Sequence, residues 1–287
     1  MSLRHLHRTA LLLGLLVFAP ARAEVLMLVH GWSADADTWL RSGVLANLAA
    51  RGWPDGGVVA AGPDGHAYFP VHASVGIRTV YRAQLPAAAP LPVQAAQLHA
   101  ELLGVRLRHP DERIILVGHS AGGLVARLAL LQPRTDPRTQ QTPLAQMLIT
   151  LGTPHLGTLR ATQGLAAVES KPFFCPGPGI DLLKHMAGGD DYRYLRSSRS
   201  LLYELQPAVY GSLLDWLNHQ PHPDIAYFAV VRGGPYAAGD ELVPAVSQDM
   251  NQVPALSGRA RVVVVPTGHG LLPADGLLLA DILDGRY

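Results

Sequence analysis

The sequence predicts a doubly wound α/β fold in one domain, with a mostly parallel sheet covered by helices on both faces. Several runs are apolar throughout instead of alternating, as is typical of strands that are buried on both faces of a sheet. These runs are residues 25–29, 114–117, 147–149, 226–231 and 262–265, with 77–81 as a weaker candidate. Helical stretches lie between them, and this alternation of strands and helices indicates a parallel sheet.

Three stretches have the apolar spacing of helices. In residues 93–108 the apolar stripe is Leu98, Leu102 and Val105, and Pro110 ends the helix because proline cannot continue it. The other two stripes are Leu124, Leu128 and Leu131, and, near the C-terminus, Leu277, Leu278 and Ile282.

Two longer segments interrupt the alternation. Residues 53–74 are rich in glycine and proline and predict a long loop or a hairpin excursion. Residues 158–222 divide into short amphipathic pieces at 180–186, 200–205 and 209–217. A long excursion between two strands of a compact domain is usually functional, so we expect a cap or lid here. The alternative is a helical insertion with no role at the site.

Residues 1–23 have the features of a Sec-type signal peptide. A basic start precedes an apolar stretch at 10–19, and small residues at Ala21 and Ala23 predict cleavage after Ala23. The apolar stretch is shorter than the roughly 20 residues that a membrane-spanning helix needs. The alternatives are a buried core helix and a signal-anchor. The sequence therefore predicts a bacterial protein that is secreted or periplasmic, with residues 24–287 as its single mature domain.

The composition excludes several classes of protein. With 287 residues, 48% hydrophobic and 16% charged, the chain is neither disordered nor collagen-like nor a polytopic membrane protein. The predicted signal peptide holds three of the 23 basic residues, and removing them leaves 20 against 22 acidic ones, a net charge near −2. Such a protein has no electrostatic reason to bind nucleic acid. Its single cysteine, Cys175, excludes an intramolecular disulfide and a Cys-based zinc site.

The most informative stretch is Gly118-His119-Ser120-Ala121-Gly122, which places G-x-S-x-G directly after a buried strand and directly before a helix. A serine hydroxyl is a weak nucleophile and has to be exposed, oriented and paired with a base. A sharp strand–turn–helix elbow orients it, because the two glycines avoid clashes in the turn. The context therefore predicts that Ser120 is a nucleophile.

An acid and a histidine follow two later strands of the predicted sheet. Asp240 comes after the strand at 226–231, and His269 comes after the strand at 262–265. Because the carboxyl ends of parallel strands meet at one edge of a sheet, we expect both beside Ser120. The order Ser120, Asp240, His269 is the order used by α/β-hydrolases. Other candidates for the acid are Glu241, Asp224 and Asp215.

Two backbone amides are candidates for an oxyanion hole. Residues 29–32 end the first strand of the mature chain, and a turn there can present the Trp32 N–H beside that of Ala121. We expect structural roles for the side chains of three nearby histidines. His30 is predicted to bond to loop backbone, His119 to pack under the elbow and His155 to form structural hydrogen bonds. No histidine has metal-ligand spacing, so no metal site is predicted.

Five motifs together indicate a family. They are His30-Gly31-Trp32, the elbow at 118–123, the Gly-Thr-Pro-His-x-Gly stretch within 151–157, the acid loop at 239–244 and Gly268-His269-Gly270. With them the chain from about Val25 onward resembles the α/β-hydrolase superfamily. It is most similar to exported bacterial lipases and to GPI inositol-deacylase-like esterases. The resemblance implies ester hydrolysis through an acyl-enzyme and no organic cofactor.

The sequence departs from the pattern of related secreted lipases in two places. Many of those lipases carry a disulfide, which Cys175 alone cannot form. Many also hold a structural calcium partly through an acid two positions after the catalytic histidine, and that position is Leu271 here. We therefore predict no calcium site. Asp275 is expected to act at the N-terminus of a helix instead.

The leading hypothesis is a serine ester hydrolase, a lipase or carboxylesterase, acting on lipid-like carboxylic esters. The same triad could serve an acyltransferase or a thioesterase, and a third hypothesis is a non-catalytic relative that acts as a binding partner. The predicted cap is rich in leucine and aromatic residues, which favours acyl chains as substrates and transient contact with lipid. Equally, these side chains could pack a small core of the cap itself.

Overall fold

The structure is a computed structural model that describes residues 23–70, 77–134, 143–170, 189–233 and 238–287. The predicted signal peptide up to Arg22, the predicted helical piece at 180–186 and Cys175 lie outside these residues. Among the described residues no helix is both long enough and apolar enough to cross a membrane.

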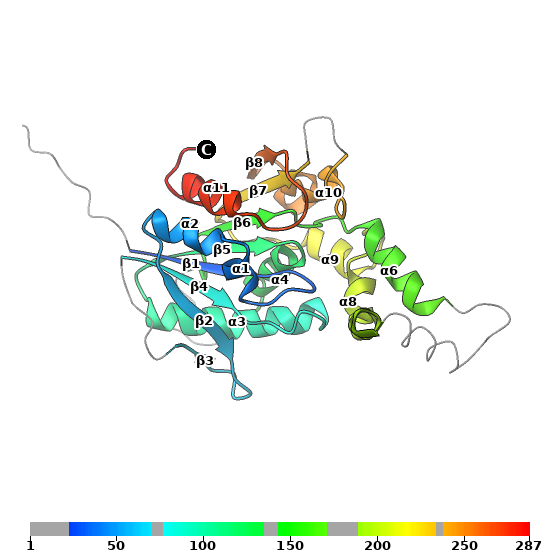
Figure 1. Ribbon diagram of the computed structural model, residues 1–287, viewed down its shortest axis with the longest axis horizontal. Coiled ribbons are helices and arrows are strands. Elements are labelled where there is room, and N and C mark those ends of the chain that lie inside the picture. Colours follow the sequence, from blue (N-terminus) through cyan, green and yellow to red (C-terminus); the bar gives the residue numbers. More distant parts are fainter. Residues whose placement is uncertain (1–22, 71–76, 135–142, 171–188, 234–237) are drawn as a thin grey trace, which may run out of the picture.

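The centre of the molecule is a sheet that runs β3-β2-β4-β1-β5-β6-β7-β8 through the described part of the chain (Figure 1). All neighbouring strands pair in parallel except β2 and β3, which are antiparallel. The strands are β1 (Glu24–Val29), β2 (Asp55–Ala61), β3 (Ala67–Tyr68), β4 (Arg78–Ala83), β5 (Arg113–His119), β6 (Met147–Leu151), β7 (Ala226–Arg232) and β8 (Ala260–Val265). The predicted mostly parallel α/β sheet is confirmed.

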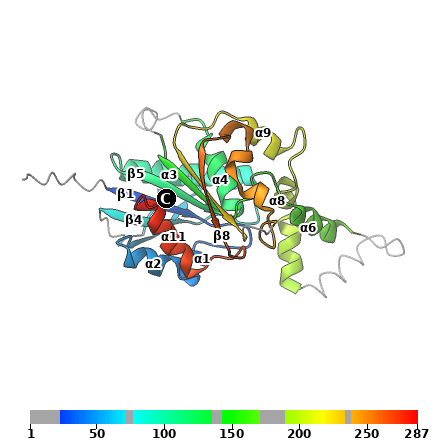
Figure 2. The same ribbon diagram turned by 90° about the horizontal axis from the view of Figure 1, so that it is seen from above.

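Helices cover both faces of this sheet. One face carries α3 (Leu91–Arg108) and α4 (Ala121–Leu130), and the other carries α1 (Thr38–Arg41), α2 (Val44–Ala50) and α11 (Pro273–Leu283). Short helices follow β7, namely α10 (Ala245–Gln248), η1 (Met250–Gln252) and η2 (Pro254–Leu256). Between β6 and β7 lie α6 (Leu159–Glu169), α8 (Arg199–Glu204) and α9 (Leu213–His219), of which α6 and α8 project from one end of the sheet (Figure 2).

The apolar runs form strands because both sides of the sheet are buried. In β1, Val25, Met27 and Val29 belong to the core under α3 and α4, whereas Leu26 and Leu28 belong to the core under α2 and α11. Consecutive side chains of a strand point to opposite faces, so a strand with helices on both sides is apolar at every position.

The structure corrects three details of the sequence analysis. The described part of the segment 53–74 does contain a hairpin, of β2 and β3, but β2 also joins the main sheet in parallel with β4. β8 is an edge strand with Val262 and Val264 partly exposed, so its apolar run is not buried on both faces. In α11 the buried stripe is Leu279 and Ile282, with Leu277 43% exposed.

Glu101 on α3 is a buried acid with few hydrogen bonds to offset the loss of water around its carboxyl group. Glu101 is fully buried, and its Oε1 accepts a hydrogen bond of 3.3 Å from the Ala61 amide in β2. Its Oε2 has no hydrogen-bond partner among the described residues. Burial raises the pKa of this carboxyl to about 9. The side chain is therefore held in the protonated form at neutral pH.

Glu101→Gln should remove a pH dependence of stability. Above the ordinary Glu pKa the unfolded chain releases this proton and the folded chain keeps it, so wild-type stability falls as pH rises toward about 9. The variant's advantage in free energy of unfolding should grow by up to about 4 kcal/mol between about pH 5 and pH 8. Urea denaturation of the wild type and the variant at both pH values measures this difference in free energy of unfolding. Glu169→Gln, at an exposed carboxylate, is the control, and an advantage that stays constant with pH would contradict the assignment.

Candidate active site

Ser120 lies in a tight elbow between β5 and α4. Its backbone has φ 53° and ψ −130°, a region that non-glycine residues occupy only under strain. A Cβ on Gly118 would lie 2.4 Å from Gly123 Cα, and one on Gly122 would lie 2.5 Å from the carbonyl oxygen of His30. The two glycines of the motif are therefore needed for close packing, as the sequence predicts.

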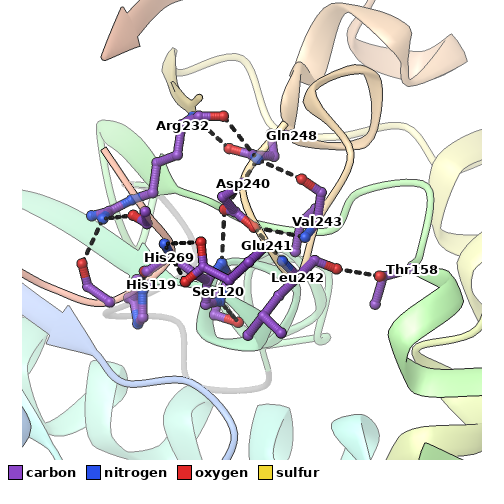
Figure 3. A network of polar contacts seen from close by, with 12 residues as sticks. His119, Ser120, Thr158, Arg232, Asp240, Glu241, Leu242, Val243, Gln248 and His269 are labelled. Atoms are coloured by element: carbon purple, nitrogen blue, oxygen red, sulfur yellow. Dashed lines mark hydrogen bonds and ion pairs between the residues drawn. The ribbon is translucent and has the colours of Figure 1, made fainter. Parts of the chain in front are cut away.

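The structure brings the three predicted side chains together although they are far apart in the sequence (Figure 3). His269 Nε2 lies 2.9 Å from Ser120 Oγ, and His269 Nδ1 lies 2.9 Å from Asp240 Oδ2. The Asp240 side chain is fully buried and that of His269 is 9% exposed. With Nδ1–H donating to the carboxylate, Nε2 is free to accept the serine proton.

Four donors surround the Asp240 carboxylate. Oδ1 accepts from the Leu242 and Val243 amides at 2.8 and 2.7 Å, and Oδ2 accepts from His269 and from Gln248 Nε2, the latter at 3.2 Å. Burial by itself would raise the pKa of this carboxyl, but the bonds from His269, Val243 and Leu242 outweigh it and lower the pKa. Asp240 is thus held as the anion that orients His269.

Gln248 is a buried residue at the site that sequence reasoning missed. Its Nε2 also donates to Val243 O at 2.8 Å, and its Oε1 accepts from the Arg232 amide at 2.6 Å. The side chain thereby ties the acid loop to the end of β7. No motif marks it, because it lies in the four-residue helix α10 and its role depends on how that helix folds back.

Arg232, the last residue of β7, fixes the loop that carries His269. This fully buried side chain donates from Nη1 to the carbonyls of Gly268 and Gly270 at 2.8 and 2.7 Å, on either side of His269. Its Nη2 lies 2.9 Å from Asp275 Oδ1 in an ion pair that is buried on both sides. Asp275 Oδ2 also accepts from the Leu272 amide at 2.7 Å, so its predicted role at the N-terminus of α11 is confirmed.

The other candidate acids have different partners. Both carboxylate oxygens of Glu241 accept from the backbone N–H of His269, at 3.0 and 3.1 Å, and not from its imidazole. Asp215 accepts from the Gly211 amide beside α9, and Asp224 is exposed near Arg259. Of the four candidates, Asp240 is the one placed on the imidazole.

The three nearby histidines have the structural partners predicted for them. His30 accepts from the Leu85 amide and donates to the Gly31 carbonyl. His119 donates from Nε2 to the His269 carbonyl at 2.8 Å, and burial lowers its pKa to about 3. His155 is buried against Arg127 and Thr150.

The loop that carries the predicted oxyanion donor runs along the nucleophile. A Cβ on Gly31 would lie 2.8 Å from Ser120 Cβ, so the backbone before Trp32 touches the elbow. Ala121 is the first residue of α4, where the amide has no acceptor within the helix. The loop is fixed from the segment between β6 and β7, because Trp32 Nε1 donates to Ser198 Oγ at 2.8 Å. The role of the Trp32 and Ala121 amides as an oxyanion hole stays a prediction.

A largely apolar pocket of about 80 Å³ opens beside Ser120 and His269. Its walls come from α6 and α8 and from the acid loop. The described part of the segment 158–222 therefore does touch the site. Among the described residues, no group of three or more histidine, cysteine or acidic side chains is arranged to hold a metal ion.

Comparisons with known proteins agree with this geometry. Residues 92–172 match a family model described as "Putative serine esterase (DUF676)", a range that includes the elbow but neither Asp240 nor His269. The fold is similar to that of the lipase BlEst2 from Bacillus licheniformis, with a TM-score of 0.56, 18% identity and coverage of 93% of this chain and 92% of that one. None of the curated proteins matches the sequence.

Two further solved structures show the same likeness. A gene product from Listeria innocua has a TM-score of 0.54 at 14% identity, covering 90% of this chain and 93% of that one. A lipase-esterase related protein from Clostridium acetobutylicum has a TM-score of 0.52 at 12% identity, covering 93% and 95%. The chain thus has the α/β-hydrolase fold, and the family match supports ester hydrolysis as its general activity.

Asp240→Asn and Glu241→Gln should separate the acid that acts on the imidazole from the acid that holds the loop. The first change puts an amide against Nδ1 and favours the wrong tautomer, so we expect kcat for an activated ester to fall by about 10⁴-fold. The second leaves the imidazole partner in place and should cost less than about 10-fold. Steady-state kinetics on both variants checks this. Equal losses, or a larger loss in Glu241→Gln, would contradict the assignment.

Proposed function

We propose that the protein is a serine ester hydrolase that cleaves carboxylic esters through an acyl-enzyme on Ser120. The single observation that carries the proposal is the chain of hydrogen bonds from Ser120 Oγ through His269 to Asp240, with 2.9 Å at each step. This is the arrangement in which a neutral hydroxyl becomes a nucleophile at neutral pH. The family match over the elbow points to the same chemistry.

In the acylation step, Ser120 Oγ attacks the ester carbonyl carbon and His269 Nε2 takes the hydroxyl proton. The carbonyl oxygen becomes an oxyanion, and we propose that the Trp32 and Ala121 amides stabilise it. One such donor typically contributes about 3 kcal/mol. Collapse of this intermediate breaks the bond to the alcohol oxygen, and His269 returns the proton to that leaving group. Asp240 stabilises the imidazolium throughout.

Deacylation repeats these steps with water as the nucleophile. His269 removes a proton from water, the hydroxide attacks the acyl carbon, and the released serine oxygen regains a proton from the imidazolium. The products of this step are the carboxylic acid and free enzyme, and water is the only co-substrate that the two steps consume.

The site favours an uncharged, apolar acyl group. Leu202 of α8 and Leu205, which directly follows that helix, line the pocket beside Ser120, together with Val243 of the acid loop. Apolar walls next to a nucleophile bind hydrocarbon better than sugars or charged acids. We propose lipid-like carboxylic esters as the substrate class and transient contact with lipid through the segment 158–222. With the signal peptide predicted at residues 1–23, we also propose that the enzyme acts in the periplasm or outside the cell.

A fluorophosphonate probe should label the purified protein and should not label Ser120→Ala. Hydrolysis of p-nitrophenyl butyrate by this variant should fall by about 10⁴-fold or more. Ser257→Ala, at an exposed serine just after η2, is the control and should keep both labelling and ester hydrolysis. Absence of labelling of the wild type, or equal labelling of Ser120→Ala, would refute the proposal.

Product analysis in the presence of added alcohol distinguishes hydrolysis from acyl transfer. A hydrolase releases mostly the free acid from p-nitrophenyl butyrate, because water resolves the acyl-enzyme. A product that is mostly the new ester would assign the same triad to an acyltransferase. A preference for thioester donors over oxygen esters would make it a thioesterase.

A further inference from the structure

We propose that the apolar pocket beside Ser120 is the acyl-binding site and that its walls on α6 and α8 limit it to acyl groups of about four carbons. This inference rests on the proposed function, since it names the substrate of the same nucleophile. The residues that set the limit are Leu202 of α8, Leu205 just after α8, and Gly164 of α6.

The volume of the pocket sets the length of the chain. An apolar cavity of about 150 Å³ holds one benzene ring, which has six carbons. The pocket beside Ser120 is about 80 Å³ and therefore has room for roughly three carbons. The carbonyl carbon is bonded to Ser120 Oγ and lies outside the pocket. Together with the three carbons inside, it makes the acyl group that fills the pocket a butyryl group. A longer chain has to displace a wall or leave part of its length in water.

The leucine wall is buried and tied to the catalytic loops. Leu202 and Leu205 are 3% and 5% exposed. The carbonyl of Leu205 accepts from the Thr158 amide at 2.9 Å, and the Thr158 hydroxyl donates to the Leu242 carbonyl in the acid loop. Moving this wall to admit a longer chain would therefore break bonds that reach the loop of Asp240.

Gly164 also lines the pocket, next to Leu202, and leaves space that a side chain would fill. It lies in the middle of α6 and is not among the residues with positive φ, so its backbone does not require glycine. A Cβ built there would lie 3.5 Å from Leu202 and 3.6 Å from Leu195, which is ordinary van der Waals contact. Alanine at this position should fold normally and shorten the pocket by about one carbon.

The tertiary contacts of this segment keep α6 and α8 at a fixed separation. A Cβ on Gly157, just before α6, would lie 2.1 Å from the Gln206 carbonyl oxygen, just after α8. The Ala208 amide donates to the Leu156 carbonyl at 2.9 Å. The chain entering α6 and the chain leaving α8 are therefore in direct backbone contact, and the width of the pocket is set by this packing.

The test measures kcat/KM for p-nitrophenyl acetate, butyrate, hexanoate, octanoate and decanoate. For the wild type we expect a gain of about four-fold per methylene up to butyrate and no further gain beyond it. Leu202→Ala and Leu205→Ala should move the optimum to hexanoate or octanoate. Gly164→Ala should lower the ratio of kcat/KM for butyrate to kcat/KM for acetate by about four-fold.

Leu201→Ala is the matched control for the leucine variants. Leu201 is the neighbouring buried leucine of α8 and does not line the pocket, so this variant should lose stability without changing the chain-length profile. Gly164→Ala keeps the test decisive if the leucine variants fail to fold, because it adds a methyl group that the structure accommodates. Thermal unfolding of each variant accompanies the kinetics.

The outcomes separate this inference from the proposed function. If the wild type hydrolyses none of the esters and is not labelled by fluorophosphonate, the proposed function fails. If it hydrolyses them and kcat/KM keeps rising to decanoate, the inference fails and the esterase assignment stands. The inference also fails if Gly164→Ala leaves the ratio of butyrate to acetate unchanged, or if Leu201→Ala shifts the profile as much as Leu202→Ala does.

Discussion

The site depends on one steric constraint, which is the close packing of main-chain atoms around Gly118 and Gly122 at the elbow. Gly118 and Gly122 have no room for a side chain, since a Cβ on either would lie within 2.5 Å of main-chain atoms. Only this close packing lets the chain turn from β5 into α4 with Ser120 at a strained φ of 53°. The hydroxyl then points out of the sheet edge, next to the loop of Trp32, because β1 and β5 are neighbours.

The imidazole and its acid are held by a second layer of buried polar groups. Arg232 bonds to the backbone on both sides of His269 and pairs with Asp275, and Gln248 connects the end of β7 to Asp240. Burying a guanidinium is costly, and breaking such an ion pair typically destabilises a protein by about 3–5 kcal/mol. The buried arginine thereby fixes the loop of His269 on both sides of the imidazole, which is the preorganisation that a catalytic triad requires.

The segment between β6 and β7 links substrate binding to this machinery. Its Ser198 accepts from the indole of Trp32, and its Thr158 donates to the carbonyl of Leu242 in the acid loop. The same segment supplies the leucine wall of the pocket. One piece of chain therefore contacts the loop of Trp32, the acid loop and the pocket proposed to bind the acyl group, so the same packing positions all three.

Local pattern in the sequence was enough to predict the parallel sheet, the elbow at Ser120 and the arrival of the acid loop and His269 at the same edge of the sheet. Uninterrupted apolar runs mark strands buried on both faces, and parallel strands deliver their following loops to one edge. The sequence predicts Asp240 as the acid but leaves the adjacent Glu241 open, because both follow the same strand and only the fold of the loop decides which carboxylate faces the imidazole. The sequence also could not predict the role of Gln248, the hydrogen bonds from Arg232 to the loop of His269, or the walls of the pocket. These depend on contacts between segments far apart in the chain, which leave no local periodicity, and only the tertiary structure decided them.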